Sequence, residues 1–226
     1  MNRLKYFIAL LTVFTAGHTL AAPPQTLMDL QQKMAGVKSV YLEFTQERVL
    51  KLFSDPLKSE GVMLVERPDE IRWETTAPYQ TILLGDHNSV AQFEFNDGKW
   101  EKLKLGFPQL LQRVMQQMSA MNQGNIGAML TDYNASVATN TDVVLTFVPK
   151  DENVRGMMSS LEVHLPPDLS TTREVVMNEP DGDLTRITFQ NEKRDVTFPA
   201  GTFDQTKPLA IADVKAAVKV APAHAP

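Results

Sequence analysis

The hydrophobic positions of this 226-residue chain change their period at about residue 36. Before that point, Leu27, Leu30 and Met34 recur at helical spacing, which predicts a helix from Pro24 to about Ala35. After it, the side chains at 40, 42 and 44 alternate with those at 41, 43 and 45, as a half-buried strand requires. The chain is therefore expected to pass from a short helix directly into a sheet.

Further short runs of strand-forming residues follow, separated by turn residues. The clearest turn is Asn96-Asp97-Gly98, a strong hairpin signal. The expected strands cover residues 61–66, 70–74, 79–84, 89–95, 99–105, 133–138, 143–148, 160–165, 174–178 and 184–190. This order predicts a meandering antiparallel sheet of about ten to eleven strands, which should curl strongly.

A second helix is expected midway, from Pro108 to about Asn122. Its apolar stripe is rich in methionine and includes Met115, Met118 and Met121. The fold class is therefore mainly β (α+β), a curled half-barrel with an N-terminal helix and an inserted helical lid. Residues 207–226 are rich in Ala, Val, Lys and Pro and are expected to form a flexible tail, with a marginal helix from Ile211 to Val220 as the alternative.

The first 21 residues have the pattern of a secretory signal peptide. Arg3 and Lys5 precede an apolar run that is too short to span a bilayer, and small residues follow it. Cleavage is expected after Ala21, because Pro23 would hinder cleavage after Ala22. The exported form, with residues 22–206 as its domain, is expected in the periplasm as a soluble monomer.

Composition narrows the possible partners. The chain has 22 Lys+Arg against 27 Asp+Glu and a net charge of −5, which does not suit nucleic acid or anionic headgroups. It has no cysteine, which excludes disulfides, thiolate metal sites and cysteine nucleophiles.

Candidate catalytic chemistry is sparse, and we expect no catalytic residue, cofactor or metal. The chain has no nucleophile elbow, zinc-protease motif or phosphate-binding glycine loop. His87 lies in an expected turn, and His164 is expected on the outer face of its strand. Asp181 and Asp183 could pair as acid and base, but turn carboxylates usually bond to the backbone.

The segment from Arg67 to Glu74 is more informative. Ile71 and Trp73 fall on one face of their strand, where core packing and ligand contact are equally good interpretations. Arg67 lies where the strand meets a turn. Its guanidinium could be a surface cation, or it could bind backbone carbonyls of a covering element, since it offers five donors.

In this region the sequence resembles the outer-membrane lipoprotein carrier (LolA-like) family. The resemblance covers residues 27–84 best, and the rest only by strand pattern. It rests on the helix at 27–34, Phe44-Thr45-Gln46, the strand beginning at Gly61, Arg67-Pro68 and Arg72-Trp73, followed by Pro78 and Ile82-Leu83-Leu84.

The resemblance implies a half-open barrel with a helical lid over an apolar cavity. Family members take lipoproteins from an inner-membrane donor transporter and pass them to an outer-membrane acceptor. Arg67 falls on the arginine that holds the lid, and Ile71, Trp73 and Leu83 fall on cavity-lining positions. After Gly85 the sequence departs from the family pattern.

The sequence thus predicts a periplasmic carrier for the acyl chains of a lipoprotein or lipid. Thioether side chains suit a surface that repacks around variable chains. The alternative is a periplasmic sensor domain that binds a lipidated or membrane-protein partner, and a small enzyme on a related fold is a third possibility. The predicted lipid-binding residues are Phe44, Met63, Val65, Ile71, Trp73, Leu83, Met115 and Met118.

Overall fold

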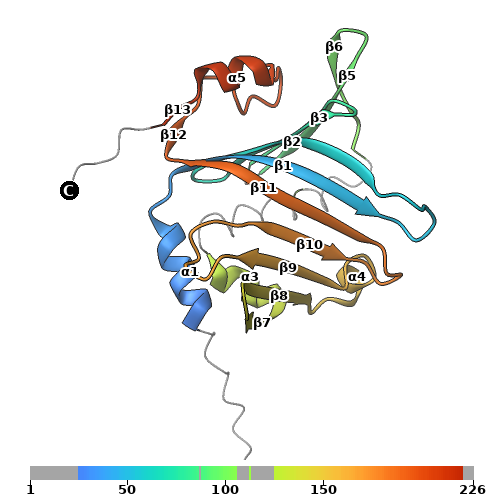
Figure 1. Cartoon of the computed structure of the whole chain (residues 1–226). Coiled ribbons are helices and arrows are strands. Elements are labelled where there is room, and N and C mark those ends of the chain that lie inside the picture. The colour runs from blue at the N-terminus through green and yellow to red at the C-terminus, as the bar shows by residue number, and fades with distance from the viewer. Residues whose placement is uncertain (1–24, 87, 106–111, 113–124, 221–226) are drawn as a thin grey trace, which may run out of the picture.

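Eleven antiparallel strands form one curled, open sheet (Figure 1). The computed structural model describes residues 25–86, 88–105, 112 and 125–220. The strands are β1 (Ser39–Val49), β2 (Leu57–Glu66), β3 (Glu70–Ala77), β4 (Thr81–Gly85), β5 (Val90–Asn96), β6 (Lys99–Lys102), β7 (Tyr133–Thr139), β8 (Val143–Pro149), β9 (Ser160–Leu165), β10 (Glu174–Asn178) and β11 (Leu184–Arg194). The predicted half-barrel of ten to eleven strands is confirmed.

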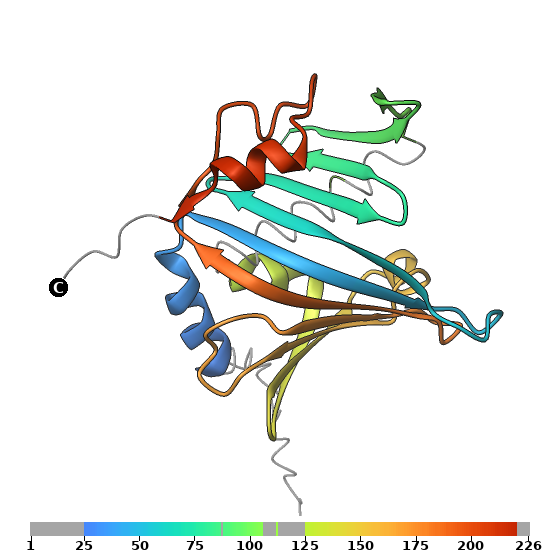
Figure 2. The same cartoon turned by 45° about the horizontal axis from the view of Figure 1, so that its top comes forward.

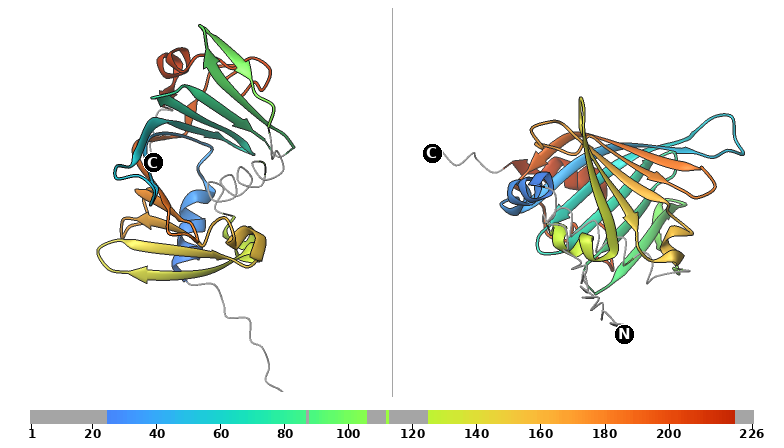
Figure 3. Two further views of the ribbon diagram at one scale, coloured as in Figure 1. Left: turned by 90° about the vertical axis from the view of Figure 1, so that its right-hand side faces the viewer. Right: turned by 90° about the horizontal axis from the view of Figure 1, so that it is seen from below.

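The two halves of the sheet meet where the first and last long strands pair. The order is β6-β5-β4-β3-β2-β1-β11-β10-β9-β8-β7, so β1 lies between β2 and β11. Strands β6 and β7 are the two edges, and the sheet is not closed into a full barrel. Seen from the side, it bends into an arc with a concave and a convex face (Figure 3).

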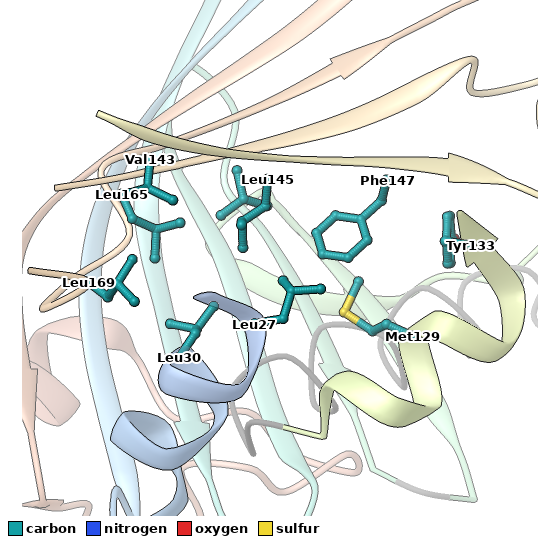
Figure 4. Packing of buried hydrophobic residues seen from close by; sticks show 10 residues of the cluster. Leu27, Leu30, Met129, Tyr133, Val143, Leu145, Phe147, Leu165 and Leu169 are labelled. Atoms are coloured by element: carbon teal, nitrogen blue, oxygen red, sulfur yellow. The ribbon is translucent and has the colours of Figure 1, made fainter. Parts of the chain in front are cut away.

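Helices cover the concave face of the β7–β9 half. Helix α1 (Gln25–Ala35) matches the first predicted helix, and α3 (Ile126–Asp132) was not predicted. Their apolar side chains pack on the strands that they cover (Figure 4). The buried cluster contains Leu27, Leu30, Met129, Tyr133, Val143, Leu145, Phe147, Val163, Leu165 and Leu169.

The C-terminal segment lies across the convex face of β1 and β2, in contrast to the expected flexible tail (Figure 2). It contains β12 (Val196–Thr197), α5 (Ile211–Ala217) and β13 (Lys219–Val220). Val214 of α5 is fully buried against Tyr41 and Leu64. Composition favoured a flexible tail from residue 207, with a helix from Ile211 to Val220 as the alternative. Helix α5 confirms the alternative, because apolar residues at 209, 211, 214 and 218 cover the sheet.

Other predicted elements differ in smaller ways. Strand β6 is shorter than expected, and α4 (Glu152–Arg155) is an additional turn of helix capped by Asp151. The signal peptide at 1–21 and nearly all of the helix at 108–122 lie outside the described residues. In the ranges that the structure describes, no helix is long and apolar enough to cross a membrane.

Candidate functional site

The strand register brings apolar side chains into rows on the concave face. Val40 pairs with Val65 and Val65 with Ile71, which makes one row. Because side chains alternate across a strand, the next row on the same face lies two residues further along. That row contains Leu42, Met63, Trp73 and Leu83.

An aromatic pair continues this surface. The Phe44 and Trp73 rings stack with their centroids 4.2 Å apart. Phe44 pairs with Gly61, and a Cβ at Gly61 would lie 2.7 Å from Phe44 Cζ and 1.9 Å from the Glu74 carbonyl oxygen. Only glycine therefore leaves room for the ring at this position, where the polar first half of β2 meets its apolar second half.

These rows form one apolar surface, which we call the concave patch. It is the part of the concave face built by β1 to β4, together with Val37 before β1, Val90 of β5 and Phe189 of β11. Trp73, Leu83, Val90 and Phe189 are only half-buried. The fully buried members are Val37, Val40, Leu42, Met63, Val65 and Ile71, to which the buried Phe44 is joined by its stack on Trp73.

Arg67 ties the turn between β2 and β3 to helix α1. Its guanidinium Nη2 donates a hydrogen bond of 2.8 Å to the carbonyl oxygen of Met34, and its backbone N–H donates to Lys38 O at 2.9 Å. Met34 lies in the last turn of α1, where carbonyls lack helical partners. The turn also carries several carboxylates, and burial together with the charges of Glu66 and Asp69 raises the pKa of Glu70.

The opposite face of β3 is polar and closed. Arg72 is fully buried and donates from Nε to Glu74 at 2.9 Å and from Nη1 to the Thr202 carbonyl at 2.8 Å. It also bonds to the carbonyl of Leu209. Burial raises the pKa of Glu74, while the guanidinium of Arg72 opposes the rise. The C-terminal segment is thus held over the convex face by a buried cation.

Six of the eight predicted lipid-binding residues come together in the concave patch. They are Phe44, Met63, Val65, Ile71, Trp73 and Leu83. Met115 and Met118 lie outside the described residues. Sequence reasoning missed Phe189, which reaches the patch because β11 pairs with β1 across a long sequence separation.

The candidate catalytic residues that the structure describes lie outside the concave patch. His164 lies on the convex face beside Glu162, and His87 lies outside the described residues. Asp181 and Asp183 lie close to Glu179, but their carboxylates accept backbone N–H groups of Asp183 and Lys51. They stabilise two neighbouring turns, as the turn interpretation predicted. A surface hollow between α1 and residues 167–169 is lined by none of the concave-patch residues.

The chain matches one protein family over most of its length. The model of the outer membrane lipoprotein carrier protein LolA family matches residues 35–206. The chain belongs to the LolA family. The predicted resemblance is therefore confirmed, and it extends well beyond the segment at 27–84 that first indicated it.

Curated relatives of this family cover most of the chain at low identity. An outer-membrane lipoprotein carrier protein from Pseudoalteromonas translucida is 21% identical over 92% of this chain and 94% of its own length. One from Dechloromonas aromatica is 25% identical over 79% of this chain and 82% of its own.

The similar solved structures are more distant in sequence. A LolA superfamily protein from Nitrosomonas europaea is 11% identical, with a TM-score of 0.42 over 82% of this chain and 99% of that one. MucB is 17% identical, with a TM-score of 0.39 over 87% of this chain and 65% of that one. The family match and the relatives' names support a lipoprotein-carrier role for the chain.

Proposed function

We propose that this LolA-family protein is a periplasmic carrier that binds lipoprotein acyl chains and moves them from the inner to the outer membrane. The observation that carries the proposal is the concave patch, with its Phe44–Trp73 stack and its half-buried margin. Acyl chains prefer such a surface to water by about 0.8 kcal/mol for each buried CH2 group.

A carrier must also release its cargo, so binding cannot simply be as tight as possible. If the empty protein closes on its own apolar surface, opening costs free energy that the cargo must offset. The hydrogen bond from Arg67 to Met34 joins the sheet to α1 and would supply part of that cost. Arg67 is thus the proposed latch of the empty state.

The two tryptophans allow a direct test, because they lie on opposite faces. Trp73 belongs to the concave patch, whereas Trp100 packs with Phe95 and with the convex cluster of Ile82 and Leu84. In Trp100→Phe the only tryptophan is Trp73, and in Trp73→Phe it is Trp100. A synthetic triacylated lipopeptide is titrated into each variant while tryptophan emission is recorded.

Emission from Trp73 should shift to shorter wavelength and reach a plateau as lipopeptide is added. Emission from Trp100 should stay constant. Equal shifts in both variants, or none in either, would contradict binding at the concave patch. Mass spectrometry of protein purified from the periplasm should also find co-purified lipid or lipoprotein. Recovery of a membrane-protein partner from a protein that never carries lipid would instead support a sensor.

A further inference from the structure

The hairpin between β1 and β2 ends in an exposed apolar tip. It reaches beyond the neighbouring strands in two views (Figures 1 and 2). At the tip Leu52 is 87% exposed, and Phe53 and Leu57 are each 54% exposed. Three large apolar side chains that share one loop and face water are more than a scatter of single surface residues, and such groups mark interaction sites.

The backbone of this tip is held by the neighbouring turn between β10 and β11. Asp183 Oδ1 accepts the backbone N–H of Lys51 at 2.8 Å, and Lys51 Nζ bonds to the carbonyl of Asp181. Within the tip, the N–H of Phe53 donates to Leu50 O at 2.9 Å. A loop that is already ordered loses little entropy on docking, which favours a binding role.

The charges around the tip distinguish a protein partner from a lipid surface. Residues 47–58 and 179–183 carry three cations and five carboxylates. The cations are engaged, since Arg48 contacts Glu179 and Lys58 contacts Glu47 at 2.9 Å. Glu179, Asp181 and Asp183 lie close together, so the surroundings of the apolar tip are negative and repel anionic lipid headgroups.

We propose that the tip at Leu52, Phe53 and Leu57 is a docking element for a protein that offers an apolar pocket with a basic rim. The partner is a membrane-held protein that exchanges cargo with this chain, and this identification rests on the proposed carrier function. The apolar side chains enter the pocket, and the carboxylates of the tip and the β10–β11 turn face the rim.

The test combines cross-linking in cells with a binding measurement. A photo-reactive phenylalanine analogue replaces Leu52 in the full chain, and cross-linked membrane proteins are identified by mass spectrometry. The identified protein is then purified, and its affinity is measured for wild type, for Leu52→Asp with Phe53→Asp, and for the matched control Tyr79→Asp. Tyr79 is 77% exposed but lies in the loop between β3 and β4.

The double variant should bind at least tenfold more weakly, the control should bind like wild type, and added salt should weaken wild-type binding. The proposal is overturned if position 52 gives no protein adduct, or if the double variant keeps wild-type affinity for the protein that was cross-linked. It is also overturned if wild type binds vesicles of phosphatidylethanolamine and phosphatidylglycerol through the tip and the double variant does not. Binding of the lipopeptide is expected to be unchanged in the double variant. If the carrier proposal itself is wrong, wild type also fails to bind the lipopeptide, so the two failures can be distinguished.

Discussion

The two faces of strand β3 have opposite chemistry and opposite coverings. Ile71 and Trp73 face the concave patch, while Arg72 and Glu74 face the convex side beneath the C-terminal segment. The convex face is closed by the chain's own residues, with a guanidinium bonded to carbonyls more than 100 residues away. The concave patch is apolar and half-buried at its margin.

In the proposed carrier, this difference lets the sheet be rigid on its convex side and adapt to cargo on its concave side. Directional hydrogen bonds to Arg72 fix the convex layer, because each buried polar group needs its own partner. Apolar contacts on the concave side impose no such geometry, so a ligand of variable shape can replace them. Four substitutions test this division of roles.

Removal of the convex cation should have the largest effect. Arg72→Met leaves the Glu74 carboxylate and two carbonyls buried without their donor, and we expect a loss of about 3–5 kcal/mol in unfolding free energy at pH 7. Urea denaturation measures the loss. Arg72→Met combined with Glu74→Leu should recover part of it, and a double variant no more stable than the single one would contradict the argument.

The loss should also depend on pH. Burial raises the pKa of Glu74 above its ordinary value of 4.5, and Arg72→Met removes the cation that opposes this rise. A carboxyl with a raised folded-state pKa favours folding below pH 4.5 and disfavours it as the pH rises through the folded-state value. The deficit of Arg72→Met should therefore shrink from pH 7 to pH 4, and the same comparison in a Glu74→Gln background should show no such change.

A side chain at Gly61 would contact both the Phe44 ring in the concave patch and the backbone of β3. Gly61→Val would press on the Glu74 carbonyl and on the Phe44 ring, and we expect a loss of about 1–3 kcal/mol or more. Thermal or urea unfolding measures it. The matched control is Gly36→Ala, where a Cβ meets nothing within 4 Å. Equal stability of the two variants would show that the ring and the carbonyl can move aside.

Loss of the proposed latch should change release more than folding. Arg67→Leu removes a charged hydrogen bond to Met34 that is worth about 1.5 kcal/mol. The closed empty state is then less stable by that amount, so we expect roughly tenfold slower release of a bound lipopeptide. Stopped-flow displacement measures the rate. Arg48→Leu, which removes a cation of the β1–β2 hairpin, is the control. Release from Arg67→Leu at the wild-type rate would exclude the latch.

The smallest effect is expected within the concave patch itself. Trp73→Phe keeps a ring beside Phe44 but reduces the apolar area, so lipopeptide affinity should fall about two- to fivefold. Stability should change by about 1 kcal/mol or less. Calorimetric titration measures the affinity. Trp100→Phe on the convex side should bind like wild type, and equal weakening by both variants would argue against a face-specific site.

The apolar surface could be predicted from sequence because strand alternation is a local property. The period of two put Leu42 and Phe44 on one face of β1 and Ile71 and Trp73 on one face of β3, and the family resemblance implied that both faces line the cavity. The same pattern put Arg72 on the other face, but gave no acceptors for its guanidinium. The C-terminal segment was expected to be flexible because its composition resembles that of a tail.

Only the tertiary structure decided what lies over each face and which distant residues complete the site. Arg72 and Thr202 are 130 residues apart, Arg67 finds its acceptor on helix α1, and Phe189 joins the patch through the β1–β11 pairing. Contacts of this kind depend on how the whole sheet curls and closes, and local periodicity does not encode that curvature. The sequence therefore determined the two faces of the sheet, and the fold determined which face its own chain covers.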